Sequence, residues 1–142
     1  MKKNYGSMLR SIAATIIGLI SASLTVYVIE SLIGHHLFPL PLGADPLNME
    51  WLSTHMHEIP VGMKICVVLA HFIGIMLGMF VAAKISKKSI IPSYIVGIMM
   101  LFATLSNIIM LPKEFWFTLS DGSLALLGFF LGKSLAKKQL QF

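Results

Sequence analysis

Four long apolar stretches limit what this chain can fold into more than any other feature of its sequence. They cover residues 11–33, 61–83, 90–111 and 118–135. A helix needs about 20 residues to cross the roughly 30 Å hydrocarbon layer of a bilayer, and each stretch reaches or approaches that length. Only 12% of the residues are charged, whereas soluble globular proteins carry about 25%. We therefore expect an all-α integral membrane protein with four transmembrane helices in an antiparallel bundle.

The four stretches leave little of the 142 residues for a separate soluble part. We expect a single membrane domain over residues 1–142, with one long connection at 34–60. The first stretch follows the basic segment "MKKNYGSMLR" and resembles a signal peptide with small residues near 21–23. Because the apolar run continues beyond these residues without a turn, we favour an uncleaved first span.

Nine of the eleven basic residues fall at three places that a four-span chain brings to one side. They are Lys2, Lys3, Arg10, Lys84, Lys87, Lys88, Lys133, Lys137 and Lys138. The positive-inside rule assigns that side to the cytoplasm, so both termini are expected inside and residues 34–60 outside. Orientation in the lipid bilayer accounts for the net charge of +5 and requires no nucleic-acid partner.

The connection 34–60 has an irregular half and an amphipathic half. The segment "GHHLFPLPLGA" is rich in proline and glycine, which predicts an extended, irregular path. The segment "DPLNMEWLSTHMHEI" predicts a short helix that Asp45 caps and Pro60 ends. One face of this helix is polar and the other apolar, which favours a helix lying on the outer surface or capping the bundle.

Five of the polar side chains within the apolar stretches form a candidate buried polar cluster, because a charge there is costly unless it is paired or used. They are Glu30, Lys64, His71, Asn107 and Asp121. Helical periodicity places Lys64 and His71 on one face, and Glu30, Lys64 and Asn107 at similar depths near the outer ends of their spans. Because consecutive spans are usually neighbours, we expect an ion pair between Glu30 and Lys64, with His71 and Asn107 lining the same interior.

A second candidate site lies in the outer connection and its surroundings. It consists of His35, His36, Glu50, His55 and His57. These are metal-ligand types, but His55 and His57 point about 160° apart on a helix, and no HExxH or paired ExxH motif is present. Haem would need axial ligands inside the bundle, where His71 is the only histidine near the middle of a span. We expect neither a metal nor another cofactor.

The single cysteine, Cys66, lies inside the second stretch. It excludes an intramolecular disulfide and a CxxC redox pair, and with them the four-span thiol oxidoreductases that use quinones. Its position is typical of a small apolar core residue.

Small residues recur at every fourth position in two of the stretches, with GxxxG pairs at Gly74 and Gly78 and at Gly128 and Gly132. Such faces allow helix backbones to approach closely. They can pack within one bundle, join copies in a homo-oligomer or bind another membrane protein, and the sequence leaves these possibilities open.

The segments "ESLIGHH", "FPLPLGADPLN", "VVLAHFIGIMLGMFVAAKI" and "NIIMLPKEFWF" together resemble small uncharacterised four-span proteins of bacteria over residues 30–117. The resemblance implies a location in the bacterial inner membrane and implies no particular activity.

Three classes of function follow from these features. The first is a non-catalytic protein that binds a partner, a lipid or another small molecule at an outward-facing polar cluster. The second is a small transporter or proton-coupled carrier that uses Glu30. Small multidrug resistance transporters also carry a glutamate in the first of four spans, but their connections are short and Glu30 lies near the outer boundary. The third is a membrane-embedded enzyme that modifies lipid or depends on a metal, although no nucleophile motif is present.

Overall fold

The computed structural model describes residues 5–111 and 114–141, and all regular elements in these residues are helical. In chain order they are α1 (Tyr5–Tyr27), the π-helix η1 (Val28–Gly34), α2 (His35–Leu37), α3 (Met49–His55), the 3₁₀-helix η2 (Met56–Glu58), α4 (Val61–Ser86), α5 (Ile91–Met110) and α6 (Phe115–Leu140). Four helices are long and apolar enough to cross a membrane: Tyr5–Leu37, Val61–Ser86, Ile91–Met110 and Phe115–Leu140. The predicted helical class and the four candidate spans are confirmed.

The long helices extend beyond several of the expected boundaries. The first was expected over 11–33 but runs over Tyr5–Leu37, because η1 and α2 continue it without a break. Its last residues therefore belong to the helix, although the sequence placed them in the outer connection. Lys2 and Lys3, which were counted for the orientation above, lie outside the described residues.

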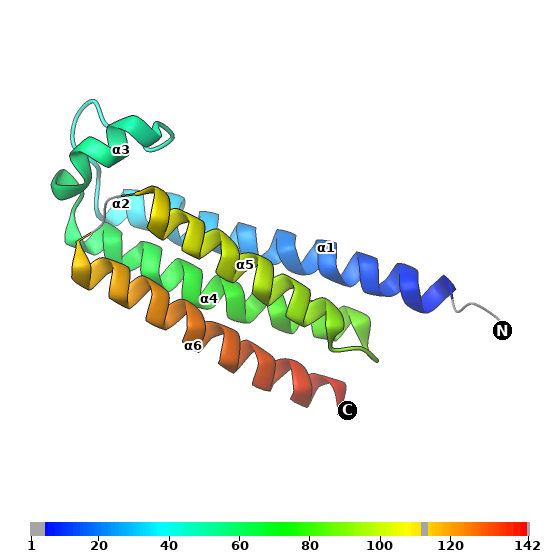
Figure 1. Cartoon of the computed structure of the whole chain (residues 1–142). Coiled ribbons are helices and arrows are strands. Elements are labelled where there is room, and N and C mark those ends of the chain that lie inside the picture. The colour runs from blue at the N-terminus through cyan, green and yellow to red at the C-terminus, as the bar shows by residue number, and fades with distance from the viewer. Residues whose placement is uncertain (1–4, 112–113, 142) are drawn as a thin grey trace.

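The long helices surround α4, which packs against α1, α5 and α6. Both termini and the turn between α4 and α5 lie at one end of the molecule, while α2 and α3 lie at the other (Figure 1). We call the end that carries α3 the roofed end and the opposite one the basic end. Helices α4 and α6 both start at the roofed end and run in the same direction (Figure 1).

Backbone contact between α1 and α4 depends on small residues. A Cβ atom added to Gly78 would lie 2.7 Å from the Cβ of Ala22 and 2.9 Å from the carbonyl oxygen of Gly18. No side chain fits at that distance, so the two helices touch through glycine and alanine. The sequence left open whether this GxxxG face packs within the chain, against a second copy or against a partner. In the structure, α1 of the same chain occupies it.

The second GxxxG face is also occupied within the chain. A Cβ atom on Gly128 would lie 2.6 Å from the carbonyl oxygen of Phe72, and one on Gly132 would lie 2.9 Å from the sulfur of Met79. Gly128 and Gly132 thus bring α6 directly against the backbone of α4. A buried hydrogen bond from the Ser93 hydroxyl to the Met79 carbonyl, 2.8 Å long, joins α5 to the same part of α4.

The outer connection contains the expected short helix, but it starts later than predicted. Asn48 caps α3, because its side-chain oxygen accepts a hydrogen bond of 3.0 Å from the backbone N–H of Trp51. The prediction of Asp45 as the cap was wrong. Asp45 instead accepts a hydrogen bond from the N–H of Leu47 two residues later, which stabilises a turn before the helix.

Candidate functional site

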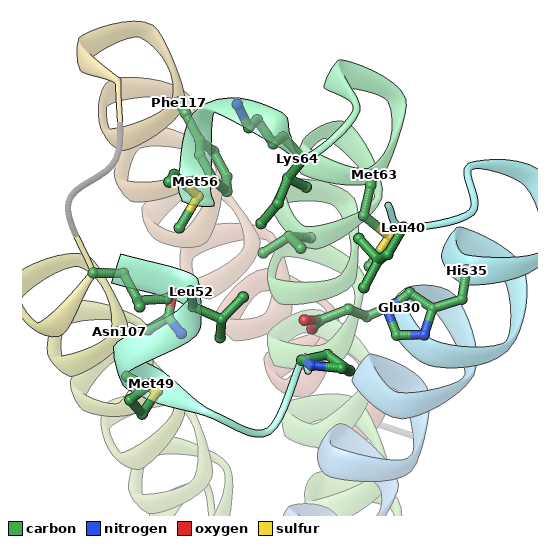
Figure 2. A pocket seen from close by; sticks show the side chains of 14 residues that line it. Glu30, His35, Leu40, Met49, Leu52, Met56, Met63, Lys64, Asn107 and Phe117 are labelled. Carbon is green, nitrogen blue, oxygen red and sulfur yellow. The ribbon is translucent and has the colours of Figure 1, made fainter. Parts of the chain in front are cut away.

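A cavity of about 180 Å³ lies at the roofed end, between α3 and η2 on one side and the long helices on the other. Most of its lining is apolar: Leu40, Pro46, Met49, Leu52, Met56, Ile59, Met63, Val67, Leu111 and Phe117. Four polar side chains join these walls: Glu30, His35, Lys64 and Asn107. Figure 2 shows Glu30 and His35 reaching the cavity from the first helix and Asn107 from α5, on another wall. Three members of the predicted polar cluster therefore surround one space.

Glu30 lies in the π-helix η1, which widens the first candidate span near the roofed end. A π-helical segment inserts extra backbone into an α-helix and is frequent at functional sites. It changes which side chains share a face, so Glu30 and His35 both line the cavity although they are five positions apart in the sequence. The sequence pattern predicted that the first span ends at residue 33 and that His35 follows an irregular path, so His35 was not grouped with Glu30.

Lys64 forms its ion pair with Glu114. The Lys64 ammonium donates to Oε1 of Glu114 at 2.5 Å, and the Lys64 side chain is only 3% exposed. The ion pair that the structure gives Lys64 is thus with Glu114, whereas the sequence predicted Glu30. The reason is the arrangement of helices: α6 begins beside the first turn of α4, and Glu114 immediately precedes it.

His71 and Asp121 form a second pair between α4 and α6. Nδ1 of His71 lies 2.6 Å from Oδ1 of Asp121, which is fully buried. Each residue follows a member of the first pair, Lys64 or Glu114, by seven positions, which is about 10 Å along a helix. The two pairs are therefore successive contacts between α4 and α6, and this second pair lies deeper in the bundle than the cavity.

The outer-connection candidates are not brought together. His35 lines the cavity, whereas His36 and Glu50 are exposed. The ring of His55 stacks on Trp51 with centroids 4.7 Å apart, and His57 lies 3.7 Å from the exposed carboxylate of Glu58. Within residues 5–111 and 114–141, no three His, Cys, Asp or Glu side chains are grouped so that they could hold a metal ion.

Glu114 and His35 are the cavity-end residues whose roles the sequence analysis missed. A signal for Glu114 was present, because the spacing of seven from Lys64 to His71 is repeated from Glu114 to Asp121. Two helices that run in the same direction and pack along one seam bring residues of equal spacing opposite each other. Using that signal requires knowing that α4 and α6 are neighbours.

The ion pair with Lys64 makes the stability of the roofed end depend on pH. The hydrogen bond from Lys64 holds the pKa of Glu114 below its ordinary value of 4.5 and outweighs burial, which acts in the opposite direction. A carboxyl whose pKa is lowered on folding stabilises the fold above its unfolded pKa, and this contribution is lost as the pH falls through the lowered pKa.

We expect the wild-type protein to be more stable than Glu114→Gln at about pH 6, and the difference to shrink as the pH falls below the ordinary carboxyl pKa of 4.5 and through the lowered pKa of Glu114. Thermal unfolding in detergent at a series of pH values measures both variants. Glu58→Gln, which removes an exposed carboxylate in the same connection, serves as the control and should show no such trend. A wild-type advantage that stays constant down to acid pH would contradict the assignment.

The Asn107 side chain gives the cavity an acceptor without an observed donor. Its Oδ1 atom is buried and has no hydrogen-bond partner among the described residues. Buried polar atoms nearly always have a partner in folded proteins, because an unpaired group costs about 1–3 kcal/mol. Together with the carboxylate of Glu30, this atom makes the cavity suitable for a group that donates hydrogen bonds.

Comparisons of the chain with protein-family models, curated proteins and solved structures found no match.

Proposed function

We propose that the protein binds a small molecule, or the polar end of a larger one, in the cavity at the roofed end. The bound group donates hydrogen bonds, as an amine or a hydroxyl does. Apolar walls with a few converging polar groups are typical of ligand sites. The Lys64 ammonium is already engaged by Glu114, so the Oδ1 acceptor of Asn107 decides which ligand group fits.

The buried Oδ1 of Asn107 is the observation that carries this proposal. It lies in the lining of the cavity, and a donor from a bound molecule would satisfy it. Glu30 supports the same chemistry from the opposite helix, since a carboxylate accepts hydrogen bonds and attracts a cation.

A cavity-filling variant tests this proposal. Val67 lines the cavity, so Val67→Phe should weaken binding of butylamine about tenfold because the ring takes the ligand's space. Val61→Phe places the same substitution on an exposed position of α4 and should leave binding unchanged. Ligand-observed NMR in detergent micelles measures both. Equal affinity of the two variants, or no butylamine binding by the wild type, would refute the proposal.

A proton-coupled carrier that uses Glu30 is a second candidate, favoured by the position of that carboxyl on a π-helix that faces the cavity. Ionisable residues inside candidate spans often belong to ion or proton pathways. In proteoliposomes, uptake of butylamine that depends on a proton gradient and disappears in Glu30→Gln would favour this candidate. Binding without uptake would leave the simple binding function.

The membrane location and its orientation belong to the same proposal. We place the four candidate spans, antiparallel in sequence order, in a bacterial inner membrane with the roofed end outside and both termini in the cytoplasm. The lysines of the basic end support this orientation.

Cysteine labelling tests the orientation. In a chain with Cys66 replaced by alanine, Asn48→Cys should react with a membrane-impermeant thiol reagent added outside intact cells. Lys88→Cys should react only after the membrane is opened, and both positions are exposed in the structure. The reverse pattern would invert the topology.

A further inference from the structure

The size of the cavity limits how much of a ligand it can hold. Its volume of about 180 Å³ is smaller than the roughly 300–1,000 Å³ of pockets that enclose whole drug-sized molecules. A membrane amphiphile that places its polar end in this cavity must therefore extend its apolar part elsewhere.

A groove between α5 and α6 offers such a place. It has a volume of about 450 Å³ and is lined mainly by apolar side chains, among them Leu101, Leu105, Ile108, Leu119 and Leu126. Leu105, Leu119 and Leu126 are each more than half exposed on the outside of the bundle, at 52%, 57% and 51%. In a membrane this groove would open directly to the acyl chains.

The groove exists because α5 and α6 are in contact at one level and apart at another. Towards the basic end, a Cβ atom on Gly97 would lie 2.7 Å from the ring of Phe129, so the helices touch there. Towards the roofed end, a Cβ atom on Gly122 would meet only the Cδ1 atom of Ile108, at 3.8 Å. Side chains thus leave space between the two helices towards the roofed end, where the cavity lies.

The cavity and the groove share the same two helices at the same level. On α5, Asn107 lines the cavity and the next residue, Ile108, lines the groove. On α6, Phe117 lines the cavity and the next residue, Thr118, lines the groove. The cavity and the groove are therefore neighbours, and residues of α5 and α6 contribute to the walls of both.

We infer that the ligand is a long-chain amphiphile from the membrane, which enters sideways between α5 and α6. Its amine or hydroxyl end occupies the cavity beside Glu30 and Asn107, and its acyl chain lies in the groove. This inference rests on the proposed binding function and adds both the class of ligand and its route. Two observations carry the inference. The acceptor-lined cavity is too small for a whole amphiphile, and an apolar groove adjoins it.

Photolabelling of the full chain tests the route. The probe is octadecylamine with a diazirine at the end of its chain, added to the protein in phosphatidylcholine nanodiscs. We expect adducts to concentrate on groove residues of α5 and α6, and an excess of butylamine to reduce them about tenfold by occupying the cavity. Gly122→Phe, which fills the groove, should reduce them to the same extent and leave butylamine binding unchanged.

Gly6→Phe is the matched control. A Cβ atom on Gly6 would meet nothing within 4 Å, and Gly6 is far from the groove residues in the sequence. If butylamine displaces adducts that map to other helices, the acyl chain does not lie in the groove, although the binding function stands. The same conclusion would follow if Gly122→Phe were labelled as fully as the wild type. Groove adducts that butylamine does not displace would separate the groove from the cavity and overturn the inference. Butylamine binding that Val67→Phe leaves intact would instead refute the binding function itself.

Discussion

Gly128→Leu should prevent α6 from packing on α4 and abolish the folded protein. A Cβ atom at this position would lie 2.6 Å from the carbonyl oxygen and 3.2 Å from the Cα of Phe72. These are backbone atoms, which cannot rotate away as a side-chain end can. Overpacking costs about 1–3 kcal/mol where side chains can adjust, and more where a helix must move. Size-exclusion chromatography and thermal unfolding in detergent measure the loss.

Gly122→Leu is the matched control for this prediction. It is the same substitution on the same helix, but the nearest atom to its Cβ is the end of Ile108, 3.8 Å away. We expect this variant to elute and unfold like the wild type. If Gly128→Leu behaved like Gly122→Leu, the close contact between α4 and α6 would be wrong.

Asp121→Leu should lower the free energy of unfolding by about 3–5 kcal/mol, because it leaves His71 buried without its partner. The structure buries Asp121 completely, with Oδ1 2.6 Å from the imidazole, so water cannot replace the lost interaction. Replacing both residues by leucine removes the uncompensated group and should recover much of the loss. Reversible unfolding of the single and double variants forms a double-mutant cycle that isolates the pair.

One outcome of the double-mutant cycle would contradict an interaction between the two side chains. If the double variant were as unstable as the sum of the single variants, His71 and Asp121 would not interact. Val61→Leu, an exposed substitution on α4, provides the baseline for changes in detergent packing.

The sequence predicted the candidate spans well because span length and hydropathy are local properties. It also identified Lys64, His71 and Asp121, which the structure buries, since each interrupts an apolar run. It failed on the partner of Lys64, because hydropathy does not show which non-consecutive helices are neighbours. Sequence order favoured Glu30 on the preceding span, whereas packing brought Glu114 on the last helix beside Lys64.

Two further misses have local physical causes. The π-helix over Val28–Gly34 has no proline or glycine in its interior to mark it, and no charge pattern distinguishes it from an α-helix. The sequence analysis named only Asp45 as the cap of the short helix, but Asn48 is an equally good capping residue and caps α3 in the structure.

The equal spacing of the two pairs fixes how α4 and α6 can move. Because Lys64 and His71 contact Glu114 and Asp121 in the same order, axial sliding by one helical turn, about 5.4 Å, would break both contacts at once. Any change in cavity volume that preserves them must come from displacement of α3 and η2, or of the first helix and α5. The first helix and α5 carry Glu30 and Asn107, so the two acceptors can be repositioned against a wall that stays fixed.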